Sequence, residues 1–304
     1  MELALMTEPH VGGASYDDLL GAARWAEEHG LAAFARSDHY YRASPSDASD
    51  AFVTLGGIAR ETSRIRLVLL VSPVTFRHPA VIAKATASLD DMSGGRFDLG
   101  VGTGWMEAEH SAFGLPFPPW GERFSMLEEA LPYLRAALRD EHATFSGTHY
   151  HLDATVRPLA PAAGIIVGGS GPRRTPRLAA RWADEYNTFV DTPDVVGTRV
   201  EALRTAAHAI GRDPDEIRVS VMGGVLVGTD RADYESRLAE EASARGIDPG
   251  ELAARLADRG EPHGTPDQAA SMLAALAGMG VERYYLQVIP HDPATVDRVV
   301  RPLL

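Results

Sequence analysis

The chain has 304 residues, a formal net charge of −13 and no cysteine. The lack of cysteine excludes disulfides, thiolate nucleophiles and cysteine-ligated metal centres. The acidic balance opposes binding to nucleic acid or to an anionic membrane, so we expect the partner to be a small-molecule substrate.

Apolar runs and helical periodicity alternate along the whole chain. The predicted strands are residues 3–6, 31–35, 65–71, 97–101, 165–167, 185–190, 217–227 and 284–289. The predicted helices are residues 16–29, 52–62, 79–92, 124–138, 176–183, 195–210, 266–277 and 294–300. Eight strands with intervening helices predict a (β/α)8 TIM barrel. No Pro/Ser-rich linker divides the chain, so we expect one domain over residues 1–304.

Two segments exceed what a plain barrel needs. Residues 143–152 alternate like a hairpin and follow the fourth predicted strand. Residues 230–259 are highly charged, follow the seventh strand and are typical of surface helices. We therefore expect insertions after strands 4 and 7.

In such a barrel the functional site lies where the strands end at their carboxyl termini. Several polar or glycine-rich features occur at these predicted positions. They are Thr7, Ser37, Asp38, His39, Ser72, Pro73, the GVGTGW stretch at 100–105, the GGSG turn at 168–171, and Asn187. Singly, each also fits a structural role: Asp38 as a cap, His39 as a surface residue, Asn187 as a turn former. Their convergence at one rim favours a site.

The two glycine-rich turns suggest different uses. Gly100, Gly102 and Gly104 lack Cβ atoms at a strand end, which either lets a flat ligand approach the backbone or simply forms a flexible turn. The turn at 168–171 precedes a helix, so its free N–H groups and the helix dipole suit a phosphate, aided by Arg173 and Arg174. Neither turn has the GxGxxG pattern of a dinucleotide-binding fold.

Other features narrow the chemistry. The single lysine, Lys84, lies in a helical pattern, which argues against a P-loop or Schiff-base enzyme. Glu107, Glu109 and His110 are either acid–base groups or solvated residues of an acidic loop. We expect no metal. The N-terminal segment has no basic and apolar leader pattern, so we expect a cytoplasmic location.

Five runs of residues resemble the bacterial luciferase-like family, and more narrowly its F420-dependent oxidoreductase branch. They are SDH at 37–39, VSPVTFRHPAVIAKATASLDDMSGGRFDLGVGTGW at 71–105, EAEHSAFGLPFPPWGERF at 107–124, VGGSGPRR at 167–174 and GTPDQ at 264–268. The resemblance implies a (β/α)8 barrel that binds the deazaflavin F420, with FMN as the alternative cofactor. Family members are often dimers, so a homodimer is also implied.

The resemblance also implies roles for individual residues. Asp38 and His39 would lie beside the deazaflavin, with His39 as a catalytic acid or base. A non-proline cis peptide and a bulge between Leu69 and Ser72 would press the ring into a bent shape. The implied cofactor-binding residues are Asp38, Leu70, Val71, Ser72, Gly102, Thr103, Gly104, Gly168, Gly169, Ser170, Gly171 and Arg173. Cations for the acidic tail of F420 would come from Arg77, Arg173, Arg174 and Arg177.

One position departs from the family. Its sugar-phosphate dehydrogenases carry a glutamate directly after the GTG of strand four, where this chain has Trp105. We therefore expect a different substrate, held in an apolar pocket formed by Thr7, Trp105 and Asn187. The expected function is hydride transfer between F420 and a small organic substrate. The alternatives are an FMN-dependent monooxygenase supplied with reduced flavin by a partner reductase, and a non-catalytic flavin-binding protein.

Overall fold

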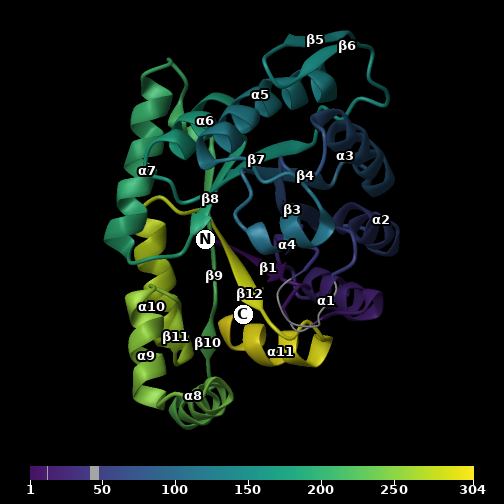
Figure 1. Cartoon of the computed structure of the whole chain (residues 1–304). Helices are drawn as coiled ribbons and strands as arrows, with labels where there is room; N and C mark the ends of the chain where they lie inside the picture. Colours follow the sequence, from purple (N-terminus) through teal and green to yellow (C-terminus); the bar gives the residue numbers. More distant parts are fainter. Residues whose placement is uncertain (12, 42–47) are drawn as a thin grey trace.

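A computed structural model describes residues 1–11, 13–41 and 48–304. Within these ranges, eight strands close into a barrel in which every neighbouring pair is parallel (Figure 1). In chain order they are β1 (Glu2–Thr7), β2 (Ala33–Arg36), β3 (Arg66–Pro73), β4 (Phe97–Gly102), β7 (Gly164–Gly168), β8 (Glu185–Phe189), β9 (Arg218–Gly223) and β12 (Arg283–Val288). The (β/α)8 barrel predicted from the sequence is confirmed.

A helix follows each barrel strand before the next one begins, which is the connection that parallel strands require. These helices are α1 (Tyr16–Glu28), α2 (Ala51–Glu61), α3 (Pro79–Ser93), α5 (Trp120–Arg139), α6 (Arg174–Trp182), α7 (Pro193–His208), α10 (Pro266–Gly278) and α11 (Pro293–Val300). Local sequence sets several of their starts. Ser15 and Asp18 form a capping box on α1, and a proline opens α3, α7, α10 and α11.

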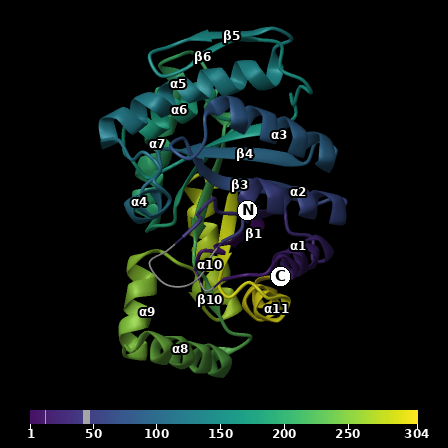
Figure 2. The ribbon, with the colours of Figure 1, turned by 45° about the vertical axis from the view of Figure 1, so that its right-hand side comes forward.

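Extra elements lie after β4 and β9, as the sequence predicted. Between β4 and β7 the chain adds α4 (Glu107–Phe113) and a hairpin of β5 (Ala143–Ser146) and β6 (His151–Ala154). After β9 it adds β10 (Leu226–Val227), α8 (Arg231–Arg245), α9 (Pro249–Asp258) and β11 (His263–Gly264). Short 3-10 turns occur at Pro214–Glu216 and Arg301–Leu303. The turned view shows the hairpin and the α8–α9 pair at opposite ends of the molecule (Figure 2).

One predicted strand is divided in the structure. Residues 217–227 were expected to form a single strand, but β9 stops at Gly223, and β10 pairs with β11 in a separate two-stranded sheet. A Cβ on Gly223 would come within 2.1 Å of Val190, so β9 ends where the chain after β8 packs tightly against it. The division opens the insertion that contains α8 and α9.

The strands bury both of their faces. Larger side chains on the outer faces pack against the helices in the main core. A smaller cluster fills the barrel interior and consists of Ala4, Met6, Ala33, Ala35, Val68, Leu70, Ile166, Met222 and Tyr285, with Val71 against it. Because strand side chains alternate, this cluster fixes which other residues point inward. Among the described residues, no helix is long and apolar enough to cross a membrane.

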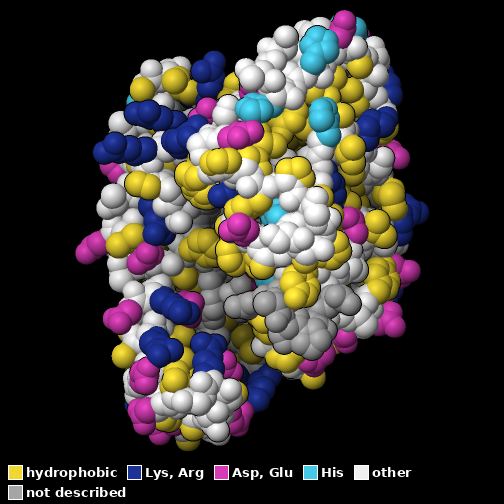
Figure 3. All heavy atoms as spheres, in the orientation of Figure 1, with side chains coloured by type: hydrophobic (Ala, Val, Ile, Leu, Met, Phe, Trp, Pro, Cys, Tyr) yellow, Lys and Arg dark blue, Asp and Glu magenta, His cyan; other side chains and the backbone are white. Residues whose placement is uncertain are grey.

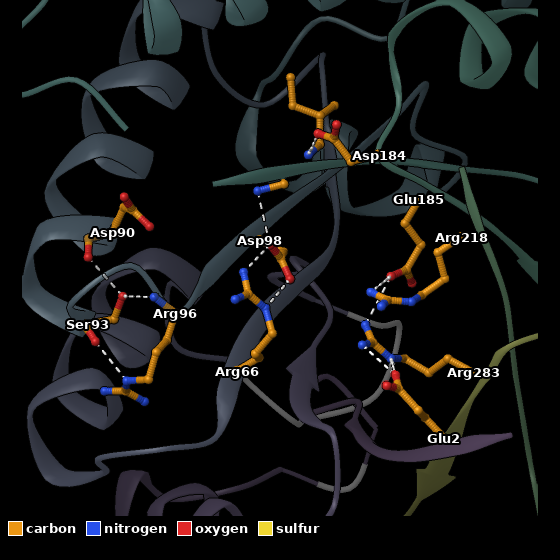
Figure 4. A network of polar contacts seen from close by, with 12 residues as sticks. Glu2, Arg66, Asp90, Ser93, Arg96, Asp98, Asp184, Glu185, Arg218 and Arg283 are labelled. Carbon is orange, nitrogen blue, oxygen red and sulfur yellow. Dashed lines mark hydrogen bonds and ion pairs between the residues drawn. The ribbon is translucent and has the colours of Figure 1, made fainter. Parts of the chain in front are cut away.

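Ion pairs close the barrel at the amino ends of its strands (Figure 4). Arg66 binds Asp98 with nitrogen–oxygen distances of 2.8 and 2.5 Å. Arg283 lies between Glu185, at 3.0 Å, and Glu2, at 2.7 Å. Burial raises the pKa of Glu185. We call this layer of ion pairs the floor of the barrel. Because it fills the amino end, the site is expected at the opposite end, at the carboxyl ends of the strands, where barrel enzymes have their active sites.

Candidate functional site

The end of β3 is irregular, as the family resemblance implied. The Leu70–Val71 peptide is cis, and the pairing of β3 with β4 shifts register between Leu69 and Ser72. The irregularity places the partly exposed Val71 side chain against the glycine turns. An added Cβ would lie 2.8 Å from Val71 at Gly100, 3.0 Å at Gly102 and 2.7 Å at Gly168. These glycines therefore make room for Val71, a role that the sequence did not indicate.

Asp38 and Ser72, predicted as neighbours of the ligand, are in direct contact. The Ser72 hydroxyl donates to Asp38 Oδ2 at 2.7 Å, and both residues are buried. Arg77 donates to the same oxygen at 2.5 Å and also binds Asp50 at 2.6 Å and the Tyr40 hydroxyl at 2.5 Å. Its charge is thus neutralised by two carboxylates, so Arg77 does not serve as the free cation expected for an acidic tail.

His39 lies between a buried carboxylate and an exposed indole. Its Nδ1 is 2.8 Å from Glu109 Oε1, and only 1% of the Glu109 side chain is exposed, against 13% for His39. The ring of Trp105, which is 64% exposed, meets the His39 ring edge-on at a centroid distance of 5.6 Å. Burial opposes a charge on His39, but the hydrogen bond and charge of Glu109, together with the charges of Glu8 and Asp38, outweigh it and raise the pKa of His39.

A second carboxylate–histidine pair lies beside the first. His10 Nδ1 is 3.2 Å from Glu8 Oε2, and the His10 ring lies 4.4 Å from the His39 ring. Gln287 donates to Glu8 Oε1 at 3.1 Å, and the Glu8 amide donates to His291 Nε2 at 2.9 Å. Although burial would raise the pKa of Glu8, its contacts with His10 and Ser37 and the nearby His39 lower it overall. Glu8, Gln287 and His10 were missed in the sequence, although Glu8 follows Ala4 and Met6 in the inward alternation of β1.

Helix α4 brings Glu109 over His39. The sequence left Glu107, Glu109 and His110 as either acid–base groups or solvated residues of an acidic loop; in the structure Glu109 and His110 are buried, while Glu107 is exposed. His110 Nδ1 donates to the Met106 carbonyl at 2.7 Å, and its Nε2 is hydrogen-bonded to the Thr75 hydroxyl at 2.7 Å. Met106, Glu109 and His110 have the i, i+3, i+4 spacing of one helical face, a signal that two polar members obscure.

The GGSG turn has the features of an anion site. It precedes α6, whose N-cap residue Arg173 makes no side-chain cap, and Arg173 is exposed. Thr175 packs beneath the turn, where a Cβ on Gly169 or Gly171 would come within 3.3 or 3.2 Å of its hydroxyl. Arg174 instead binds Glu128 at 2.8 Å. The uncapped helix start and Arg173 offer N–H donors and charge to a phosphate.

The remaining predicted site residues do not all face the barrel interior. Asn187 has the inward position of β8, and its amide donates to Ser220 at 2.9 Å. Thr7 shares the parity of Leu5, which packs in the outer core, and its hydroxyl donates to the Ala35 carbonyl at 3.0 Å. The structure therefore does not bring the Thr7 side chain to the inner face. Thr103 and Gly104 are partly exposed beside Trp105.

The space-filling view shows hydrophobic side chains gathered over the middle of the face that α4 covers, with histidine surface among them (Figure 3). The fold defines a (β/α)8 barrel protein, and its candidate site lies at the carboxyl ends of the strands, next to the start of α6, which has no side-chain cap. Among the described residues, no group of three or more histidines and carboxylates could hold a metal ion.

Comparisons with known proteins identify the family. The model described as luciferase-like monooxygenase matches residues 1–286, and the chain belongs to this family. An F420-dependent glucose-6-phosphate dehydrogenase of Nakamurella multipartita is 37% identical over 222 residues, which cover 70% of this chain and 65% of that protein. The matched region thus spans less than two thirds of that relative.

Solved structures of similar fold include two enzymes of different chemistry. A coenzyme F420-dependent tetrahydromethanopterin reductase of Methanopyrus kandleri has a TM-score of 0.79 and 20% identity, covering 100% of this chain and 99% of that one. A monooxygenase of Streptomyces bottropensis has a TM-score of 0.82 and 24% identity, covering 99% and 97%. At these identities the likeness concerns the fold.

Proposed function

We propose that the protein is an F420-dependent oxidoreductase that moves a hydride between the deazaflavin and a small organic substrate. The observation that carries the proposal is the position of His39, held by Glu109 and facing the exposed Trp105 at the open end of the barrel. Family membership and the F420-dependent relative support the cofactor. When bound, a deazaflavin supplies hydride transfer without readily activating oxygen.

The residues of the site fit such a cofactor. The turn at Gly168–Gly171 and the exposed Arg173 would hold its phosphate, because the start of α6 has no side-chain cap. Val71, Thr103 and Gly104 are partly exposed and would line the ring. Asp38 and Ser72 form one hydrogen-bonded unit next to them, and Leu70 and Gly102 back this wall from buried positions.

His39 would handle the proton of the reaction. Because Nδ1 faces Glu109, Nε2 is the nitrogen that remains for the substrate. Trp105 would exclude water and pack against an apolar part of the substrate. Asn187 would contribute from the opposite side of the barrel interior.

The surroundings of His39 favour an uncharged substrate over a sugar phosphate. Trp105 stands where the family's sugar-phosphate enzymes have a carboxylate, and the nearby Arg77 is bound by Asp38 and Asp50. A phosphate group beside His39 would also meet the carboxylates of Glu8 and Glu109. We expect purified protein given F420 to oxidise or reduce small alcohols or carbonyl compounds faster than glucose 6-phosphate, and the opposite ranking would refute this assignment.

The second candidate is an FMN-dependent monooxygenase, which the description of the matching family favours. The two functions differ in their use of oxygen. Reduced FMN forms an oxygen adduct, so a monooxygenase would consume oxygen with reduced FMN and a substrate, whereas an F420 enzyme would work under anaerobic conditions. Tighter binding of FMN than of F420 in an equilibrium titration would overturn the first proposal and favour the second.

A further inference from the structure

We infer that Glu109 is the positioning residue of His39: it fixes the ring through Nδ1 and leaves Nε2 toward the open site, where that nitrogen can exchange a proton with the substrate. This inference rests on the proposed function for its catalytic meaning. The contact itself needs no ligand, because it joins two residues of this chain: Glu109 in α4 and His39 in the segment after β2.

The carboxylate of Glu109 is held from two adjacent residues. Oε1 is 2.8 Å from His39 Nδ1, and Oε2 accepts the amide of Tyr40 at 3.1 Å. Both partners are donors when Nδ1 carries its proton, so two acceptor oxygens are needed. A glutamine has only one. If its oxygen accepted from Tyr40, its NH2 group would face Nδ1 and select the neutral tautomer protonated at Nε2.

The carboxylates around His39 favour its protonated form. The groups that face it are Glu109 from α4, Glu8 and His10 from the segment after β1, and Asp38 next to it in the chain. Burial of the ring opposes its protonation. The hydrogen bond to Glu109 is the largest influence that favours protonation. Glu109 is itself almost inaccessible to water, so little solvent screens the pair.

The position of Glu109 is secured independently of His39. In the same helix, His110 is fully buried, bonded to Met106 and Thr75, and packed against Phe76 at a ring distance of 4.9 Å. Helix α4 is therefore fixed on the β3–α3 connection whether or not Glu109 is charged. Replacing Glu109 should change the state of His39 without releasing the helix.

The test is the pKa of His39 in the ligand-free protein, measured by NMR of labelled histidines and assigned with the variant His39→Ala. We expect a pKa above the ordinary range for histidine in the wild type, and a fall of about one to three units in Glu109→Gln, as expected when a close opposite charge is lost. Glu107→Gln is the matched control, since Glu107 is exposed on the same helix and should leave the pKa of His39 unchanged. Glu109→Asp should give an intermediate pKa.

An unchanged pKa of His39 in a folded Glu109→Gln protein, or an equal fall in Glu107→Gln, would overturn the inference. If Glu109→Gln does not fold, an unshifted pKa in Glu109→Asp would do the same. In turnover with F420, the alkaline limb of the rate profile should move down in pH by the shift that NMR records. Because the NMR result needs no cofactor, failure of F420 to bind would refute the proposed function and leave the role of Glu109 standing.

Discussion

Replacing Gly100, Gly102 or Gly168 with alanine should change the free energy of unfolding. The loss should be larger where the atom nearest to the new methyl group is less able to move. The nearest atom to an added Cβ is the Leu69 carbonyl oxygen at 2.3 Å for Gly100, a Val71 methyl at 2.7 Å for Gly168, and a Val71 methyl at 3.0 Å for Gly102. None of the three has a positive φ, so the added methyl group itself causes the effect. Only the first neighbour is backbone, which cannot move aside alone.

The magnitudes follow from the cost of overpacking. Gly168→Ala should lower the free energy of unfolding by about 1–3 kcal/mol, and Gly100→Ala should lie at or above the top of that range. Gly102→Ala should be close to neutral, because a small clash is offset by about 0.4–1 kcal/mol from the reduced entropy of the unfolded chain. Urea unfolding of each variant measures these values.

Val71→Ala separates the two kinds of clash. It removes the methyl groups that oppose Gly168→Ala, so the double variant should recover most of that loss relative to Val71→Ala alone. It leaves the Leu69 carbonyl in place, so Gly100→Ala should be rescued only in small part. Equal rescue of both variants, or equal costs at Gly100 and Gly102, would refute this account of the turn.

Three further predictions concern Arg283 in the floor of the barrel, Trp105 at its open end, and Arg173 beside the GGSG turn. Arg283→Met should cost up to about 3–5 kcal/mol at neutral pH, because it removes the nearer of the two arginines that face the buried Glu185 and leaves only Arg218 at 3.7 Å. Burial already raises the pKa of Glu185, so the cost should shrink on acidification as that carboxyl becomes protonated in both the folded and the unfolded state, which urea unfolding across pH would detect. F420 should quench tryptophan fluorescence, and much of the quenching should vanish in Trp105→Phe; undiminished quenching would place the ring elsewhere. Arg173→Glu should weaken binding of F420 far more than binding of a deazaflavin without phosphate, and an equal loss for both would remove Arg173 from the phosphate site.

Strands and glycine turns were predictable because each depends on a short stretch of sequence. A buried parallel strand is an apolar run, and β4 and β7 each run into a cluster of glycines. The irregularity at Leu70 and Val71 was anticipated only through the family resemblance, since nothing in their side chains signals it. The orientation of Thr7 could not be predicted in this way, because β1 is apolar at both parities and only the packing of Leu5 on one face and of Ala4 and Met6 on the other shows which side is the interior.

The pairs that define the site were not predictable in the same way. Glu109 and His39 are 70 residues apart and meet because α4 lies against the segment that follows β2. Glu8 and Gln287 come from opposite ends of the chain and meet where β1 and β12 close the barrel. Arg77 was a candidate cation until its pairing with Asp38 and Asp50 was known. Charge in a sequence says little about which groups neutralise one another across a barrel.

The central claim is that the barrel mouth is built for F420, and a competition titration tests it most directly. Protein saturated with FMN would be titrated with F420, and protein saturated with F420 would be titrated with FMN, while the fluorescence of each cofactor is followed. We predict that F420 displaces FMN at comparable concentrations and that FMN fails to displace F420. Displacement of F420 by FMN, or no binding of F420 to folded protein, would contradict the proposed function.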